Sequence, residues 1–253
     1  MTSAAALRIQ IEHSLQHRFP AALSPMARST LETAATGIAA VDELLQGGLP
    51  VGAISEITGP VSSGRTSLAL AFIARRTDED NVCAWVDAGD ALDPESAAAS
   101  GVALSRLLWV RCRDTAPPAL RKPWTRLDQA LRSTDMLLQA GGFASLVLDL
   151  GATTPEQGCR IPLATWFRFR QAADRTRCSL VVLAQASFAQ SSAAVVLDCS
   201  PLQARSKGGT VLTGFDYQVQ RGRQRFNSGS ISRRKPPASV WQAATAWESE
   251  KRA

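Results

Sequence analysis

The sequence predicts an α/β protein with a mostly parallel central sheet, helices on both faces of that sheet, and antiparallel strands at its C-terminal edge. Short, wholly apolar segments alternate with amphipathic ones, which is the pattern of parallel strands covered on both faces by helices. Beyond residue 195 polar and apolar residues alternate between tight glycine turns, as in antiparallel strands. The 253 residues, 45% hydrophobic and 20% charged, suit one large α/β domain with short appendages.

The elements follow from these patterns in order along the chain. Residues 4–19 are expected to form a helix, because Leu7, Ile11 and Leu15 recur at helical spacing and a proline ends the pattern. A stretch rich in Pro, Ser and Thr then indicates a linker. Strands are predicted at residues 51–58, 82–87, 107–111, 144–150, 180–184 and from 195 onward, and helices at 66–76, 95–100, 127–140 and 163–175. The predicted organisation is an N-terminal helix and linker (1–36), a core (37–230), and a basic linker with a tail helix (231–253).

The tail helix is expected to begin at Ser239, after two consecutive prolines. Val240, Ala244 and Trp247 recur at helical spacing with Trp241 alongside, so one face of the helix would carry two tryptophans. A short helix is marginal alone in water, and its apolar face must therefore be buried. We expect Trp241 and Trp247 to dock in a partner protein, the alternative being that the tail packs on this protein's own sheet.

The charge balance is basic, with 28 Lys and Arg against 22 Asp and Glu. Residues 201–235 carry eight basic side chains and a single acid, Asp216. Such a cluster is the electrostatic footprint expected for a phosphate-backbone partner, although a solvated positive face is the alternative. The residues predicted to bind DNA are Arg205, Lys207, Arg221, Arg223 and Arg225.

Several classes of protein are excluded by what the sequence lacks. No apolar run approaches the ~20 residues of a membrane span, and no secretory signal pattern opens the chain. The five cysteines are scattered and form no CxxC pair, so we expect reduced thiols rather than disulfides or a zinc site. We therefore expect a cytoplasmic protein.

The segment GPVSSGRT, residues 59–66, has the context of a phosphate-binding loop, since it follows a predicted strand and opens a predicted helix. Its glycines allow backbone N–H groups to face an anion. Thr66 would offer a hydroxyl to Mg²⁺, and Asp149, at the end of a predicted strand, a carboxylate that supports the direct ligands of the ion. Arg65 stands where the motif has lysine, and its longer, forked side chain is no conservative replacement. ATP or ADP with Mg²⁺ is thus the implied ligand, with inefficient hydrolysis, and the alternative is a loop that keeps the fold but binds no nucleotide.

The segment TGIAAVDELLQGGLPVGAISEITGP (residues 36–60) resembles the beginning of the RecA recombinase core, and so do CAWVDAGDALDP (83–94) and LAQ (183–185). The resemblance runs from about residue 7 to about residue 225 and implies a RecA-like fold. It implies further that Asp93 contacts a nucleotide and that Gln185 senses its γ-phosphate. The candidate nucleotide-binding residues are therefore Gly59, Ser62, Ser63, Gly64, Arg65, Thr66, Ser67, Asp93, Asp149 and Gln185.

The departures from the RecA pattern fall at functional positions. The family's catalytic glutamate is replaced by Gly89, and Asp90 beside it would start from the wrong face of the turn. The position of the adenine-stacking aromatic holds Ser96, and only residues 186–194 form the loop that carries DNA contacts in the family. The sequence therefore predicts no catalytic residue at this site.

A truncated RecA relative with these changes resembles the ImuA-type, SulA-related proteins of bacterial DNA-damage cassettes. That resemblance implies a non-catalytic accessory protein of translesion synthesis and damage-induced mutagenesis, associated with the nucleoid on damage. Its implied partners are an ImuB-like polymerase subunit, an error-prone DnaE-type polymerase, RecA, and weakly bound single-stranded DNA. Leu7, Ile11 and Leu15 would contact a RecA-type core, a second copy included, unless they pack on their own core. The alternatives are an active DNA-dependent ATPase or recombinase-like motor, and a regulator that caps RecA filaments.

Overall fold

The computed structural model describes residues 32–113, 124–207, 211–224 and 237–244. Among the helices in these ranges, none is both long and apolar enough to cross a membrane. The predicted N-terminal helix with Leu7, Ile11 and Leu15 lies outside the described residues, as do Arg225 and Trp247.

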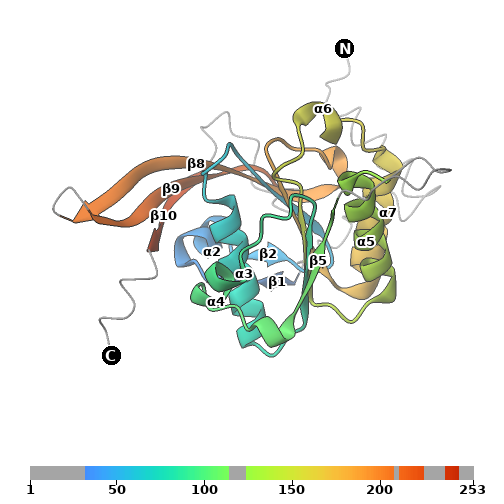
Figure 1. Cartoon of the computed structure of the whole chain (residues 1–253), viewed down its shortest axis with the longest axis horizontal. Helices are drawn as coiled ribbons and strands as arrows, with labels where there is room; N and C mark the ends of the chain where they lie inside the picture. Colours follow the sequence, from blue (N-terminus) through green and yellow to red (C-terminus); the bar gives the residue numbers. More distant parts are fainter. Residues whose placement is uncertain (1–31, 114–123, 208–210, 225–236, 245–253) are drawn as a thin grey trace, which may run out of the picture. The chain divides into compact units, whose positions relative to one another are not determined.

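The described strands form an eight-stranded sheet in the order β10-β9-β8-β3-β7-β6-β4-β5 (Figure 1). Every pairing from β8 to β5 is parallel, whereas β9 is antiparallel to β8 and β10 is antiparallel to β9. The predicted fold class is thus confirmed, including the antiparallel C-terminal edge. The strands are β3 (Ile54–Thr58), β4 (Cys83–Asp87), β5 (Leu107–Arg111), β6 (Ser145–Asp149), β7 (Ser179–Ala184), β8 (Ala193–Lys207), β9 (Val211–Gln224) and β10 (Ala238–Ala244).

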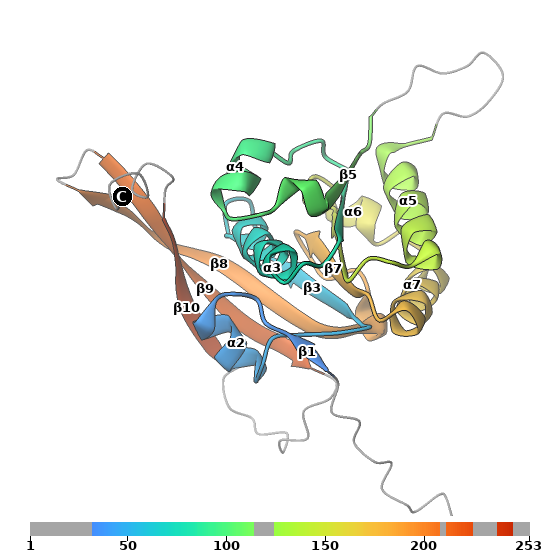
Figure 2. The same ribbon diagram turned by 90° about the horizontal axis from the view of Figure 1, so that it is seen from below.

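Helices cover both faces of the parallel part of this sheet (Figure 2). Successive strand residues point to opposite faces, so Trp85 packs with α2, α3 and α4, while Val86 packs with α5 and α7. Both side chains are fully buried. The helices are α2 (Ala39–Leu45), α3 (Arg65–Asp78), α4 (Pro94–Ala99), α5 (Arg126–Ala140), α6 (Pro155–Gly158) and α7 (Leu163–Thr176), with 3₁₀ turns η1 (Leu104–Arg106) and η2 (Gln190–Ser192).

The core begins before residue 37, where the sequence places the end of a linker. Strand β1 (Thr33–Ala34) pairs antiparallel with β2 (Leu49–Pro50). A Cβ on Gly48 would lie 2.1 Å from the carbonyl oxygen of Ala34, so glycine permits this close approach. Thr36 is fully buried, and its N–H and hydroxyl both donate to Asp42 Oδ1, at 2.7 and 2.8 Å. The predicted end of the linker at residue 36 is therefore wrong, because residues 33–36 already belong to the core.

The tail prediction is wrong for residues 238–244, which form strand β10 rather than a helix. Trp241 is 5% exposed and packs against Tyr217 with 4.9 Å between ring centroids, whereas Val240 is 49% exposed. The inward and outward residues therefore alternate with the period of a strand. The edge of β9 supplies a pairing partner for this segment, and tertiary context of this kind overrides local pattern. Trp241 thus belongs to this protein's own core, which was the alternative left open.

Candidate phosphate-binding site

The segment between β3 and α3 has the backbone of an anion-binding loop. Gly59, Ser62 and Gly64 have positive φ angles of 147°, 62° and 86°, and α3 begins immediately afterwards at Arg65. No side chain caps the N-terminus of α3, so its first N–H groups face the loop without that partner. Successive N–H groups turned inward beside a helix N-terminus attract anions. The loop lies at the carboxyl edge of the central parallel strands, where ligands bind in α/β folds.

Two neighbouring strands pack closely against the glycines of this loop. A Cβ on Gly59 would lie 2.2 Å from the carbonyl oxygen of Cys199 on β8. A Cβ on Gly64 would lie 2.7 Å from the ring of Tyr217 on β9. Tyr217 is also hydrogen-bonded to the side chain of Ser67 on α3, and burial raises its pKa. The antiparallel edge of the sheet therefore forms a wall of the loop.

Arg65, which replaces the lysine of the motif, is buried rather than extended into solvent. Its side chain is 9% exposed, and Nη1 has no hydrogen-bond partner. Burial lowers the pKa of Arg65, and attraction to Asp149 and Cys199 opposes that effect. Nη2 lies 3.6 Å from the position that a Cβ on Gly151 would occupy. The guanidinium is thus folded toward the end of β6.

The residues predicted to contact nucleotide from β6 and β7 meet at the same point. The N–H of Gly151 donates to Asp149 Oδ1 at 2.9 Å, and Nε2 of Gln185 donates to the carbonyl of Gly151 at 3.1 Å. Burial raises the pKa of Asp149 to about 6; the Gly151 hydrogen bond and Arg65 act against this, while Asp87 adds to it. The structure therefore brings Arg65, Asp149 and Gln185 together around Gly151. Thr66 lies exposed on the first turn of α3.

The acidic side chains near residue 89 are all engaged by the protein itself. Asp87 is fully buried and accepts hydrogen bonds from the N–H groups of Gly89 and Leu92, at 3.1 and 2.8 Å. Asp90, whose φ is 54°, forms a two-pronged ion pair with Arg111 at 2.5 and 2.9 Å. Hydrogen bonds and charge from Arg111 lower the pKa of Asp90. Both carboxylates therefore already have partners within the protein.

Asp93 serves as the N-cap of α4. It accepts hydrogen bonds from the N–H and the hydroxyl of Ser96, at 3.0 and 2.5 Å, and these bonds lower its pKa. The Asp93 carboxylate, which the resemblance assigns to the nucleotide, is therefore hydrogen-bonded to the N-terminus of α4. Ser96, at the position of the family's aromatic, is its partner.

Thr66 and Asp149 offer oxygen atoms of the kind that Mg²⁺ binds, whereas the guanidinium of Arg65 beside Asp149 does not fit the ion. The ion requires a near-octahedral set of oxygen ligands. Here Asp149 already accepts the Gly151 N–H, and the guanidinium of Arg65 supplies positive charge beside it. A divalent cation at that point would be repelled by the buried guanidinium. Within the described ranges, no group of three His, Cys, Asp or Glu side chains is arranged to hold a metal ion.

The loop after Gln185 is held by Glu56, a residue that the sequence reasoning missed. Glu56 is fully buried on β3, and Oε1 accepts the N–H groups of Phe188 and Ala189, at 2.7 and 2.8 Å. Oε2 accepts the Ser187 hydroxyl at 2.5 Å. In the sequence, only the presence of an acidic residue inside an apolar strand indicates that Glu56 has a special role. The loop is therefore fixed to the strand that precedes the phosphate-binding segment.

Of the basic residues that form one cluster in the sequence, the two whose side chains the structure describes, Arg205 and Arg221, lie far apart. Arg205 lies opposite Gly214 near one end of the β8–β9 hairpin, whereas Arg221 lies opposite Leu197 near the other. Eight residues of strand, about 26 Å, separate the two positions. Arg205 forms an ion pair with Asp216 at 2.8 Å, and Arg221 donates to the carbonyl of Leu44 at 2.9 Å. Hydrogen bonds from Gln203 and Arg205 lower the pKa of Asp216. Lys207 and Arg223 lie on the same two strands.

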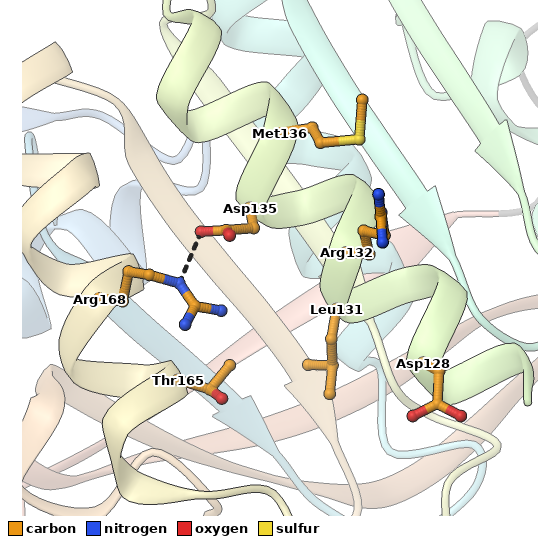
Figure 3. Close-up of a pocket in the computed structure, with 7 residues that line it drawn as sticks. All are labelled: Asp128, Leu131, Arg132, Asp135, Met136, Thr165 and Arg168. Carbon is orange, nitrogen blue, oxygen red and sulfur yellow. Dashed lines mark hydrogen bonds and ion pairs between the residues drawn. The ribbon is translucent and has the colours of Figure 1, made fainter. Parts of the chain in front are cut away.

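A groove of about 450 Å³ lies between α5 and α7, on the face of the sheet opposite α3 (Figure 3). An ion pair of 3.0 Å between Asp135 and Arg168 crosses it, as Figure 3 shows. Its lining mixes acidic, basic and apolar side chains. The groove is not part of the phosphate-binding site.

The β3–loop–α3 segment, with strand β6 ending at Asp149 beside it, defines a protein with the phosphate-loop α/β fold. The chain belongs to the RecA family, because the RecA N-terminal domain matches residues 4–160. Protein RecA of Allorhizobium ampelinum is 44% identical over 128 residues, which cover 50% of this chain and 32% of that protein. Protein RecA of Rhizobium rhizogenes and of Brucella canis are each 43% identical over 127 residues, covering 49% of this chain and 32% of theirs. The chain thus spans about a third of the length of these relatives. The resemblance to RecA is confirmed at the level of the family.

Proposed function

We propose that this protein is a RecA-like accessory protein of DNA damage tolerance that holds a nucleotide without hydrolysing it efficiently. The observation that carries this proposal is that the carboxylates near Gly89 are already hydrogen-bonded or ion-paired within the protein. Efficient hydrolysis in this class needs a residue that orients the attacking water and a cation that stabilises the phosphoryl group. Here the family's glutamate is absent, and Asp87 and Asp90 are bound by neighbouring groups.

The substitution at position 65 supports the same proposal. A lysine delivers a compact ammonium to the phosphates, whereas an arginine is planar and forked. Arg65 is folded toward Gly151 and Asp149 instead of remaining an extended, mobile side chain. The loop after Gln185, held by Glu56, further supports a protein that lacks the mobile DNA loop of a recombinase.

ATP turnover by designed revertants tests this proposal. Wild type, Arg65→Lys, Gly89→Glu and the double variant are compared at equal concentration with and without single-stranded DNA. A Cβ on Gly89 would lie 3.1 Å from that of Ala152, so Ala152→Gly is included with Gly89→Glu to give the new side chain room. We expect background turnover by wild type and a gain in the combined variant. RecA-like turnover by wild type that Asp149→Ala abolishes would refute the proposal.

One observation favours a second candidate, an active DNA-dependent motor. Asp149 and Gln185, which the sequence associates with the metal and with the γ-phosphate, are both hydrogen-bonded to Gly151. The same turnover assay separates the two functions, because a motor is stimulated by single-stranded DNA and an adapter is not.

The role in translesion synthesis, with an ImuB-like subunit, a DnaE-type polymerase and RecA as partners, rests on the resemblance to ImuA-type proteins. Capture of these three purified partners by the tagged full chain tests it, and failure to bind any of them would refute it. Weak single-stranded DNA binding is part of the proposal. Because Arg205 and Arg223 lie at strand positions near opposite ends of the hairpin, Arg205→Glu and Arg223→Glu are measured separately. Loss of one phosphate contact reduces the slope of log affinity against log salt by about 0.7.

A further inference from the structure

The guanidinium of Arg65 is a buried cation with an unused hydrogen-bond donor. Its side chain is 9% exposed, and Nη1 has no hydrogen-bond partner. Buried polar groups in folded proteins are nearly always paired, and an unpaired buried charge is especially unfavourable. The residue that carries this donor is the first of α3, whose N-terminus has no capping side chain, and its guanidinium is folded toward Gly151. A buried positive charge with a free donor at that position is suited to an anion.

The surroundings of the guanidinium show which role it takes. Nη2 lies beside Gly151, whose N–H holds Asp149 Oδ1 at 2.9 Å and whose carbonyl accepts Gln185. Asp149 is the carboxylate that the phosphate-loop context of residues 59–66 predicts behind the direct ligands of Mg²⁺. Arg65 therefore places a permanent positive charge, supplied by the chain itself, next to the carboxylate expected to support the metal.

We propose that Arg65 takes the place of the divalent cation, so that the loop at residues 59–64 binds a phosphate chain in its metal-free form. The inference rests on the proposed function, in which the loop holds a nucleotide without efficient hydrolysis. An arginine fork donates to two phosphate oxygens at once, and its charge is independent of metal supply. A chelated Mg²⁺ would instead have to share the space beside Asp149 with the buried guanidinium, which is larger than the ammonium of a lysine.

Calorimetric titration of the full chain with inorganic triphosphate tests the proposal. The titration is run once with Mg²⁺ in excess and once with EDTA. We expect wild type to bind at least as tightly in EDTA as with Mg²⁺. We expect Arg65→Lys to reverse this order, because the smaller ammonium leaves room for the ion beside Asp149. Arg65→Gln should weaken binding in both buffers by about tenfold to a hundredfold, the loss of a charged hydrogen bond.

Arg170→Lys, an exposed substitution on α7, is the matched control and should leave both affinities unchanged. Wild-type binding that requires Mg²⁺ overturns the inference, and so does full binding by Arg65→Gln. The wild-type comparison between the two buffers decides the question even if a variant fails to fold. Mg²⁺-dependent binding without ATP turnover refutes this inference alone. ATP turnover in the separate assay refutes the proposed function.

Discussion

Replacing Trp241 by alanine tests whether the last described strand is part of the folded core. The indole is 5% exposed and lies 4.9 Å from the ring of Tyr217. Truncation of a buried tryptophan lowers the free energy of unfolding by about 3–5 kcal/mol. The buried indole N–H has no hydrogen-bond partner, so its removal offsets about 1 kcal/mol of this loss in unfolding free energy. The expected net loss is therefore about 2–4 kcal/mol, a fall in Tm of about 4–16 °C for a domain of this size.

Thermal and urea unfolding followed by far-ultraviolet circular dichroism measure this loss. Trp241→Phe keeps a ring against Tyr217 and should lose less than about 1.5 kcal/mol. Val240→Ala, at the exposed neighbouring position, should change stability by no more than about 0.5 kcal/mol. If Trp241→Ala melts at the wild-type temperature, β10 contributes nothing to the core and the packing argument fails.

Three further predictions concern the phosphate-binding loop and its supports. Gly64→Ala should destabilise the fold by about 1–3 kcal/mol, because φ is 86° and the new methyl would meet the Tyr217 ring; an unchanged urea midpoint would contradict this. Burial raises the Asp149 pKa from 3.8 to about 6, so the folded protein favours the protonated carboxyl. The stability gained from this proton is fully present below pH 3.8 and is lost as the pH rises through 6. The free energy of unfolding of Asp149→Asn, relative to that of wild type, should therefore rise by up to about 3 kcal/mol as the pH increases from 3.5 to 7.5. A difference between the two proteins that does not change with pH would refute the reasoning. Glu56→Gln should lower the free energy of unfolding by about 1–3 kcal/mol and make the loop at residues 186–192 cleavable in limited proteolysis. Ser187→Ala removes one of the three donors to Glu56 and should lower it by about 1 kcal/mol. Equal losses in the two variants would contradict the role of Glu56 in holding this loop.

The central part of the fold follows from the sequence because its signals are local. An apolar strand, a glycine-rich turn and an amphipathic helix in succession specify β3, the loop and α3 without reference to distant residues. The edge strand β10 could not be predicted in the same way. Its residues fit a helical stripe as well as a strand, and the pairing edge of β9 decided between the two.

The candidate site shows the same division between local and distant causes. Arg65 and Gly89 are visible in the sequence as departures from a motif. The ion pair between Asp90 and Arg111 joins two different strand ends, and no spacing along the chain predicts it. Arg205 and Arg221 lie far apart because the register of a long hairpin, rather than distance along the chain, determines which of its residues meet.

The packing of the loop also determines the order in which the protein can acquire its site during synthesis. Thr58, just before the loop, bonds to Leu197 across 139 residues, and the wall that Tyr217 forms against Gly64 comes later still. Chains are made from the N-terminus, and contacts between distant residues form slowly. The loop segment therefore leaves the ribosome early but gains its neighbours only when most of the chain has been made. A nascent chain that ends before β9 contains every residue of the phosphate-binding motif and lacks the wall against which the loop packs.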